Sequence, residues 1–314
     1  MPVRSLPLTD DAPRILLEGI VDYAGLFPPS GLAMPAAVRN YAHYRGGGAG
    51  WMLGRFVCPA NALEQFSEAA EVLLPRDAGA IPWRLTVTGS GDTTADLAAI
   101  AAFNERHLVC FDDRGAIVDA YEVKAAGVEA IHRIDATIPA SLETYIEVPI
   151  GAADTGMMIA AIARTGRRAK MRTGGVTLEA FPAAEAIVEF LRCCLAHGVT
   201  AKATAGLHHP MCGFYRLAYD DESPTGPMFG FLNVFLTAAV LASGGSPADA
   251  VLLLNESDPK AFAVNDLHVG WRGPEQMLAF DRALLQRVRQ NVLTSFGSCS
   301  FAEPVGESRA LGLL

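Results

Sequence analysis

The chain has 314 residues, of which 51% are hydrophobic and 19% are charged. This balance allows a large apolar core and argues against an intrinsically disordered protein. The formal net charge of −9, with no run of Lys or Arg, argues against a nucleic-acid-binding surface, so we expect no nucleic-acid partner.

Short runs rich in β-branched and aromatic residues alternate along the chain with longer segments of helical periodicity. Eight of these runs are predicted strands: residues 19–27, 51–57, 83–89, 118–125, 144–150, 168–175, 199–206 and 262–269. Strand and helix repeat at roughly 25 to 35 residues per unit, except in a longer seventh unit. Eight such units predict an α/β protein with a single domain over residues 1–314, a (β/α)8 TIM barrel. The alternative is a doubly wound open sheet, although no predicted strand leads into a GxGxxG turn.

Two segments fall outside this repeat. Residues 207–228 follow the seventh predicted strand without clear periodicity, and loops of this length in compact domains tend to be lids or binding loops. In a barrel this loop would lie at the carboxyl-terminal rim, where such enzymes keep their active sites. Residues 297–314 are predicted to be a C-terminal tail.

The compartment is predicted from what the sequence lacks. The N-terminal residues show no apolar stretch of the signal-peptide kind, and the longest apolar run, near residue 230, is too short to span a bilayer. We therefore expect a cytoplasmic protein with no membrane partner. The six cysteines show no CxxC spacing and are predicted to be free thiols. Cys299, in the run SFGSCSF, is the one to consider as a nucleophile, but no histidine lies near it in the sequence.

Charged residues occupy alternate positions of several predicted strands, and residues two apart on a strand face the same way. Lys170 thus shares a face with Arg172, and Lys202 shares a face with Thr204. The intervening residues are mostly small or apolar and suit the surface beneath the helices, so the charged ones are predicted to face the barrel axis. Four further charged residues are placed there by the same reasoning: Asp22, Glu122, Lys124 and Glu147.

The predicted interior carries more positive than negative charge, since four cations face two or three carboxylates. A locally positive mouth in a globally acidic protein concentrates small anions, so we predict that the ligand is a small anionic metabolite with a carboxylate or a phosphate. Ion pairs that only pack the interior are the structural alternative. A buried pair, however, is often no more stabilising than apolar residues of similar size.

Two lysines fall at matching depth on consecutive predicted strands, which lie about 4.8 Å apart. If the ammonium groups of Lys170 and Lys202 come within about 6 Å, a repulsion of roughly 3 kcal/mol would lower one pKa by about two units. Burial acts in the same direction, whereas Glu122 and Glu147 oppose it. A lysine with a neutral amine near neutral pH can attack a carbonyl group and hold the substrate as a Schiff base.

The motif KMRTGG, followed after a helix by TAKATAGLHH, resembles strands six and seven of the deoxyribose-phosphate aldolase type of class I aldolase, a (β/α)8 barrel. The resemblance covers about forty residues. It implies a Schiff base at Lys170, with Lys202 as the neighbour that lowers its pKa. It also implies that Gly174 and Gly206 supply backbone groups for anion binding, and that Glu122 stands near the position of a family aspartate.

We therefore expect a Schiff-base lyase or aldolase that acts on a small anionic carbonyl compound and needs no cofactor. Lys170 or Lys202 would be the nucleophile. Glu122 or Glu147 would move protons, and His208 would assist from the loop. The residues expected to bind substrate are Asp22, Lys124, Arg172, Gly174, Thr204 and Gly206.

Two other classes stay open. A metal-dependent lyase or hydrolase could use His208, Glu147 and Asp22 as ligands. Against this, the adjacent His208 and His209 point apart and the cations oppose a divalent ion, so we expect no metal. A non-catalytic barrel could instead use the lysines and Arg172 only to hold an anionic metabolite. In each case a homo-oligomer is expected.

Overall fold

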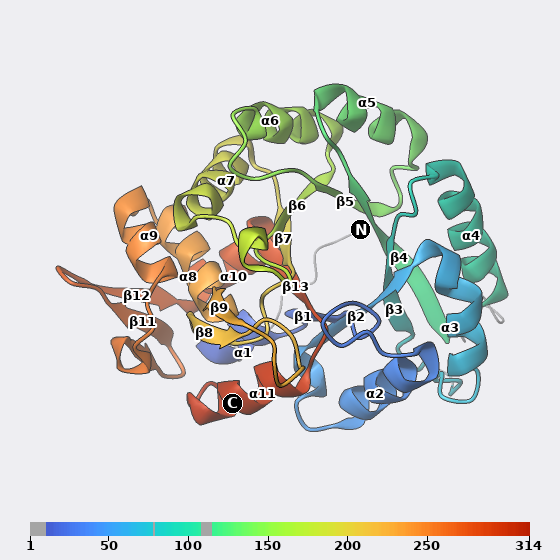
Figure 1. Ribbon diagram of the computed structural model, residues 1–314, viewed down its shortest axis with the longest axis horizontal. Helices are drawn as coiled ribbons and strands as arrows, with labels where there is room; N and C mark the ends of the chain where they lie inside the picture. The colour runs from blue at the N-terminus through green and yellow to red at the C-terminus, as the bar shows by residue number, and fades with distance from the viewer. Residues whose placement is uncertain (1–10, 78, 108–114) are drawn as a thin grey trace.

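The structure is a computed structural model that describes residues 11–77, 79–107 and 115–314. Eight parallel strands close into a barrel surrounded by helices, which confirms the predicted (β/α)8 fold (Figure 1). The barrel strands are β1 (Val21–Tyr23), β2 (Leu53–Pro59), β3 (Trp83–Thr88), β4 (Ala116–Lys124), β5 (Glu143–Glu147), β6 (Arg168–Arg172), β7 (Ala201–Thr204) and β13 (Leu293–Ser298). Because β1 pairs with both β2 and β13, the sheet has no free edge.

Helices follow the barrel strands and cover the outside of the barrel (Figure 1). α7 shows why these segments are helical: its buried residues Ile187, Leu191 and Cys194 recur at helical spacing, and it ends at Gly198, which takes the left-handed conformation (φ 64°). The helices are α1 (Ala12–Leu17), α2 (Met34–Gly46), α3 (Leu63–Ala70), α4 (Thr93–Arg106), α5 (Val128–Thr137), α6 (Thr155–Thr165), α7 (Ala184–His197), α8 (Phe231–Ala242), α9 (Pro247–Leu254), α10 (Arg282–Asn291) and α11 (Ala302–Ala310).

The prediction of the eighth strand at residues 262–269 is wrong. This segment contributes β10 (Phe262–Val264) and the start of β11 (His268–Arg272), which form an antiparallel sheet with β12 (Met277–Asp281) outside the barrel, at the left of Figure 1. The barrel is closed by β13, which runs into the residues predicted to be the C-terminal tail. β13 lacks an apolar run because it contributes small or polar residues, Ser295 and Gly297, to the inside of the barrel.

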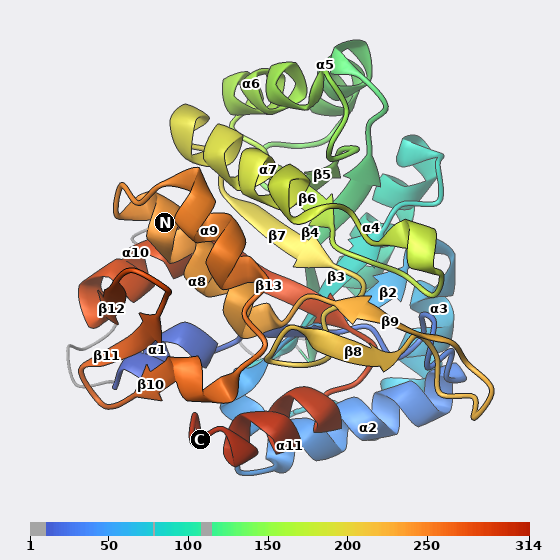
Figure 2. The same ribbon diagram turned by 60° about the vertical axis from the view of Figure 1, so that its left-hand side comes forward.

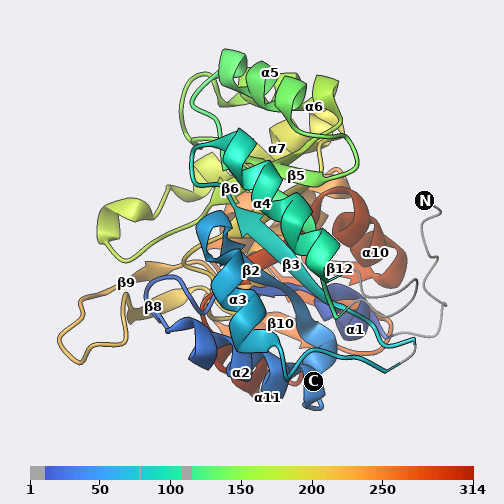
Figure 3. The same ribbon diagram turned by 90° about the vertical axis from the view of Figure 1, so that its right-hand side faces the viewer.

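The segments predicted as a loop and a tail both contain regular structure. Within residues 207–228, β8 (Gly213–Arg216) and β9 (Thr225–Met228) form an antiparallel hairpin. Figures 2 and 3 show this hairpin projecting at the end of the barrel toward which β7 points. The expectation of a tail at 297–314 is corrected, because these residues end β13 and form α11, in which Val305 and Ser308 are buried.

The apolar core lies between the barrel and its helices. Phe296 of β13, for example, stacks on Phe231 of α8 with ring centroids 4.8 Å apart. In the described ranges, no helix is both long and apolar enough to cross a membrane.

Candidate active site

The inside of this barrel carries charged side chains, whereas the interiors of such barrels are usually filled by branched aliphatic residues. Strand register brings the charges together, because Lys170 lies opposite Lys202 on one side and opposite Glu147 on the other. Both lysines are buried, with Lys170 6% exposed and Lys202 1% exposed. The prediction that these side chains face the barrel axis is thus confirmed.

Lys170 lies between two carboxylates. Its Nζ is 2.6 Å from Glu122 Oε2 and 2.9 Å from Glu147 Oε2. Glu122 comes from β4 and Glu147 from β5, and the side chains of all three residues are almost completely removed from solvent. This arrangement holds the amine in one place and puts two proton acceptors within hydrogen-bond distance.

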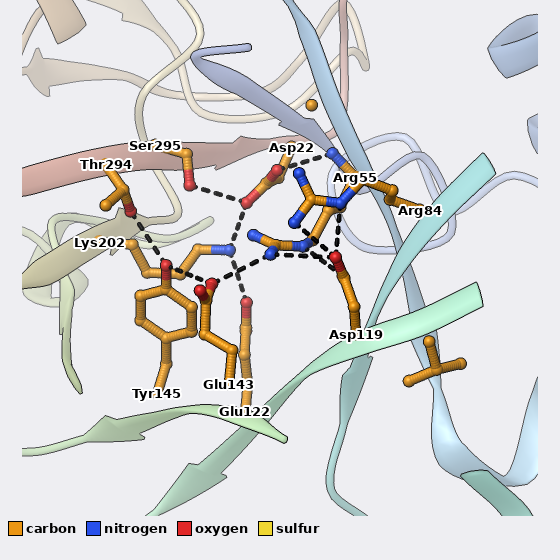
Figure 4. A network of polar contacts seen from close by, with 12 residues as sticks. Asp22, Arg55, Arg84, Asp119, Glu122, Glu143, Tyr145, Lys202, Thr294 and Ser295 are labelled. Atoms are coloured by element: carbon orange, nitrogen blue, oxygen red, sulfur yellow. Dashed lines mark hydrogen bonds and ion pairs between the residues drawn. The ribbon is translucent and has the colours of Figure 1, made fainter. Parts of the chain in front are cut away.

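Lys202 lies between a second pair of carboxylates, as Figure 4 shows. Its Nζ is 2.5 Å from Asp22 Oδ2 and 2.7 Å from Glu122 Oε1. Asp22 is held in turn by Ser295 Oγ and by the backbone N–H of Arg55, each 2.8 Å away. Glu122 therefore bridges the two lysines, and the ion-pair chain runs through Asp22, Lys202, Glu122, Lys170 and Glu147.

This pairing narrows one expectation. Burial by itself would lower the pKa of Lys202, but the carboxylates of Asp22 and Glu122 outweigh it, so the pKa is raised above its ordinary value. Burial likewise opposes the charge on Glu122, but Lys170 and Lys202 outweigh it and lower its pKa to about 2. Of the two lysines, Lys202 is therefore not the one whose pKa is lowered, and its surroundings favour the charged form.

A second group of ion pairs lies beside the ion-pair chain (Figure 4). Arg55 contacts Asp119 at 2.7 Å and Glu143 at 3.0 Å, and Arg84 also contacts Asp119. Tyr145 donates to Glu143 at 2.9 Å. None of these side chains lines the cavity described below, so we assign this group a structural role.

A cavity of about 720 Å³ opens above the ion-pair chain, at the carboxyl ends of the strands. Its size and position suit a small-molecule site. The predicted residues that line it are Glu122, Lys124, Glu147, Lys170, Arg172, Thr204, Gly206 and His208. Asp22 and Lys202 lie beneath the cavity and do not line it, so their predicted contact with substrate is corrected: they support Glu122 from below. Lys170 is thus the buried lysine that a ligand can reach.

Two cations stand at the mouth of this cavity. Arg172 Nε lies 3.5 Å and Lys124 Nζ 3.9 Å from the same oxygen, Glu147 Oε1, and their side chains are 46% and 77% exposed. Burial would raise the pKa of Glu147, but Lys170, Arg172 and Lys124 together lower it. The mouth is therefore positive, with cations free to take a second anionic partner.

The two predicted glycines have a packing role. Gly206, with φ 71°, is in the left-handed region, and a Cβ there would lie 2.9 Å from Gly174 Cα. A Cβ on Gly174 would lie 2.4 Å from the ring of Phe181. Gly206 lines the cavity and Gly174 does not, so close packing accounts for Gly174 without an anion.

The histidines are separated as expected. His208 Nδ1 lies 3.1 Å from Ser298 Oγ at the cavity wall, whereas His209 stacks on Tyr215 and contacts Glu307 at 2.7 Å. In the described part of the chain, no three His, Cys, Asp or Glu side chains are placed to hold a metal ion. His208, Glu147 and Asp22 therefore do not form the ligand set that the metal-dependent alternative requires.

Sequence reasoning missed much of the cavity wall. Ser90 lines it from the connection between β3 and α4, Thr93 lines it as the first residue of α4, and Tyr121 lines it from β4. The Tyr121 hydroxyl donates a hydrogen bond to Asp96 at 2.6 Å, and Asp96 also accepts a hydrogen bond from Ser90 Oγ at 2.6 Å. The available signal was the run GSGDTT directly after a predicted strand, since such turns form the rim of a barrel.

Comparisons with known proteins add no further constraint. No family model matches the sequence, and no similar protein was found among the curated proteins searched.

Proposed function

We propose that the protein is a Schiff-base lyase or aldolase and that Lys170 is the nucleophile. The supporting observation is that Lys170 Nζ lines the cavity while held between Glu122 Oε2 and Glu147 Oε2. The resemblance of KMRTGG to strand six of class I aldolases gives Lys170 the same role. Lys202 has the neighbouring position in that resemblance, and its part here is to fix the charge and position of Glu122.

Imine formation requires Lys170 to lose its proton first. Glu147 Oε2 is 2.9 Å away and can accept it, after which the neutral amine adds to the substrate carbonyl and the nitrogen–carbon bond forms. The carbinolamine then loses its oxygen as water when Glu147 returns a proton to it. The protonated imine withdraws electrons from the neighbouring carbon–carbon bond, which can break or form.

An anionic substrate would favour this proton transfer. Arg172 and Lys124 contact Glu147 Oε1, and their charges help to lower the pKa of Glu147. A substrate carboxylate or phosphate that binds these cations weakens their hold on Glu147, which becomes more basic toward Lys170. The preferred substrate is therefore a small carbonyl compound with an anionic group. A cytoplasmic homo-oligomer remains our expectation for the working protein.

Reductive trapping tests this proposal. Wild-type protein incubated with glyoxylate, pyruvate or a small phosphorylated aldehyde and then with borohydride should gain the mass of the reduced adduct. Lys170→Arg keeps the positive charge but removes the nucleophile, so its mass should not change. A mass gain that persists in Lys170→Arg would assign the imine to another amine. Unchanged mass of the wild type across the panel would favour a barrel that only binds its ligand.

Substitution of Arg172 should weaken the capture of anionic carbonyl compounds selectively. Arg172→Ala should raise the glyoxylate concentration needed for half-maximal trapping by about tenfold or more, since hydrogen bonds to charged groups contribute roughly 1.5–3 kcal/mol. Trapping of a neutral aldehyde should change much less. Arg192→Ala, which removes an exposed arginine on α7 paired with Glu189, is the matched control. Equal losses for anionic and neutral aldehydes would contradict a role in anion binding.

A further inference from the structure

We propose that Cys299 and His208 form a second reactive centre in the same cavity, a thiol–imidazole pair whose sulfur adds reversibly to an aldehyde ligand. Cys299 Sγ lies 3.8 Å from His208 Nδ1, and both residues line the cavity. The pairing depends on the true position of the eighth barrel strand. β13 pairs directly with β7, so Cys299, just after β13, meets His208, just after β7.

The surroundings of this thiol favour its ionised form. His208 Nδ1 also lies 3.9 Å from Glu303 Oε2. Ser30 and Tyr219 are further polar neighbours, and the Tyr219 hydroxyl lies 3.7 Å from Sγ and donates to Glu303 at 2.9 Å. The phenol of Tyr23 also lies near enough to interact with the thiol. Burial alone would raise the pKa of Cys299, but the hydrogen bond and the charge of His208 outweigh it and lower it.

The other described cysteines lack this combination. Burial raises the pKa of Cys58 to about 12, and the pKa values of Cys193, Cys194 and Cys212 are raised as well, in each case first by burial. Of the described cysteines, Cys299 is the one that lines the cavity. Among the described cysteines, Cys299 is therefore the one whose thiol is both activated and open to a ligand.

The chemistry follows from these two side chains. His208 accepts the thiol proton as Cys299 Sγ forms a bond to the aldehyde carbon and the carbon–oxygen π bond breaks, and His208 then gives that proton to the oxygen. The product is a hemithioacetal with neutral His208, and the reverse steps release the aldehyde. No oxidant or further reactant is needed. This centre does not depend on an imine at Lys170, so either site can exist without the other.

Alkylation with iodoacetamide tests the proposal without knowledge of the natural ligand. Labelling is followed by peptide mass spectrometry between pH 5 and 10, with Cys212 as the internal reference because it is partly exposed and lacks a neighbouring imidazole. Cys299 should be labelled first, with a midpoint pH below that of an ordinary thiol, about 8.5. His208→Asn should slow labelling of Cys299 at pH 7 roughly tenfold and leave Cys212 unchanged.

Two outcomes would overturn the proposal. In the first, wild-type Cys299 is labelled no faster than Cys212, and the pH midpoint of Cys299 labelling is that of a free thiol. This comparison needs no variant. The other is a His208→Asn variant that is folded by circular dichroism and labelled at the wild-type rate. If that variant does not fold, His208→Gln replaces it. Because the readout is on Cys299 and the trapping readout is on Lys170, failure of one experiment leaves the other interpretable.

Discussion

Glu122→Ala is expected to lower the free energy of unfolding by about 3–5 kcal/mol, the usual cost of removing one partner from a buried ion pair. The effect falls at the high end because Glu122 is the carboxylate shared by Lys170 and Lys202, so its loss leaves two buried ammonium groups short of a partner. Urea denaturation followed by circular dichroism measures the change.

The matched control for this variant is Glu64→Ala. Glu64 pairs with Arg106 at 2.5 Å on the surface, with side chains 71% and 49% exposed, so its loss should cost at most about 1 kcal/mol. A loss of less than about 1 kcal/mol in Glu122→Ala would show that the bridging carboxylate does not hold the two lysines.

Acid should destabilise the protein through its buried carboxylates, because a surface carboxylate with an unshifted pKa contributes no pH dependence. The pKa of Glu122 is lowered from 4.5 to about 2, and those of Asp22 and Glu147 are lowered too. A carboxylate with a lowered folded-state pKa stabilises the fold above its unfolded-state pKa, and this stability is lost as the pH falls toward the folded-state value. Glu122 alone should contribute roughly 3 kcal/mol, lost between about pH 5 and pH 2.

Lys202 gives stability the opposite dependence on pH. Its pKa is raised, so its contribution is fully present below the unfolded-state pKa, near 10.5, and is lost only as the pH rises further toward the folded-state value. The contribution of the ion-pair chain should therefore be flat from about pH 5 to about pH 10 and fall on both sides. Urea midpoints measured across this range test the profile, and Glu64→Gln should reproduce it. A midpoint that stays constant from pH 7 to pH 3 would contradict the ion-pair chain.

Much of the fold could be predicted because β1 to β5 carry β-branched or aromatic residues, and β6 and β7 alternate small or apolar residues with charged or polar ones. The eighth barrel strand could not, because β13 is the stretch LTSFGS, whose small and polar residues fit the interior beside Asp22. Residues 262–269 have a stronger strand pattern and do form strands, but in an outer sheet. Sequence pattern thus indicates a strand without indicating the sheet to which it belongs.

The alternation of charged and apolar residues along the strands predicts which side chains face the barrel axis. It does not predict which charged side chains form ion pairs with each other. Asp22 and Lys202 are 180 positions apart and meet only because the barrel closes. The sequence suggested that the two ammonium groups would repel each other and lower one pKa, whereas Glu122 lies between them and the pKa of Lys202 is raised. The contact of Cys299 with His208 was hidden for the same reason, since it requires β13 next to β7.

The central claim is that Lys170, and no other lysine, receives the carbonyl ligand. The chain has four lysines, at positions 124, 170, 202 and 260, so the site of a reduced adduct can be assigned without ambiguity. The most direct measurement is tandem mass spectrometry of unaltered protein after reduction in the presence of glyoxylate. We predict that the adduct lies on Lys170, with Lys202 unmodified. An adduct confined to the exposed Lys124, or located on Lys202, would contradict the assignment.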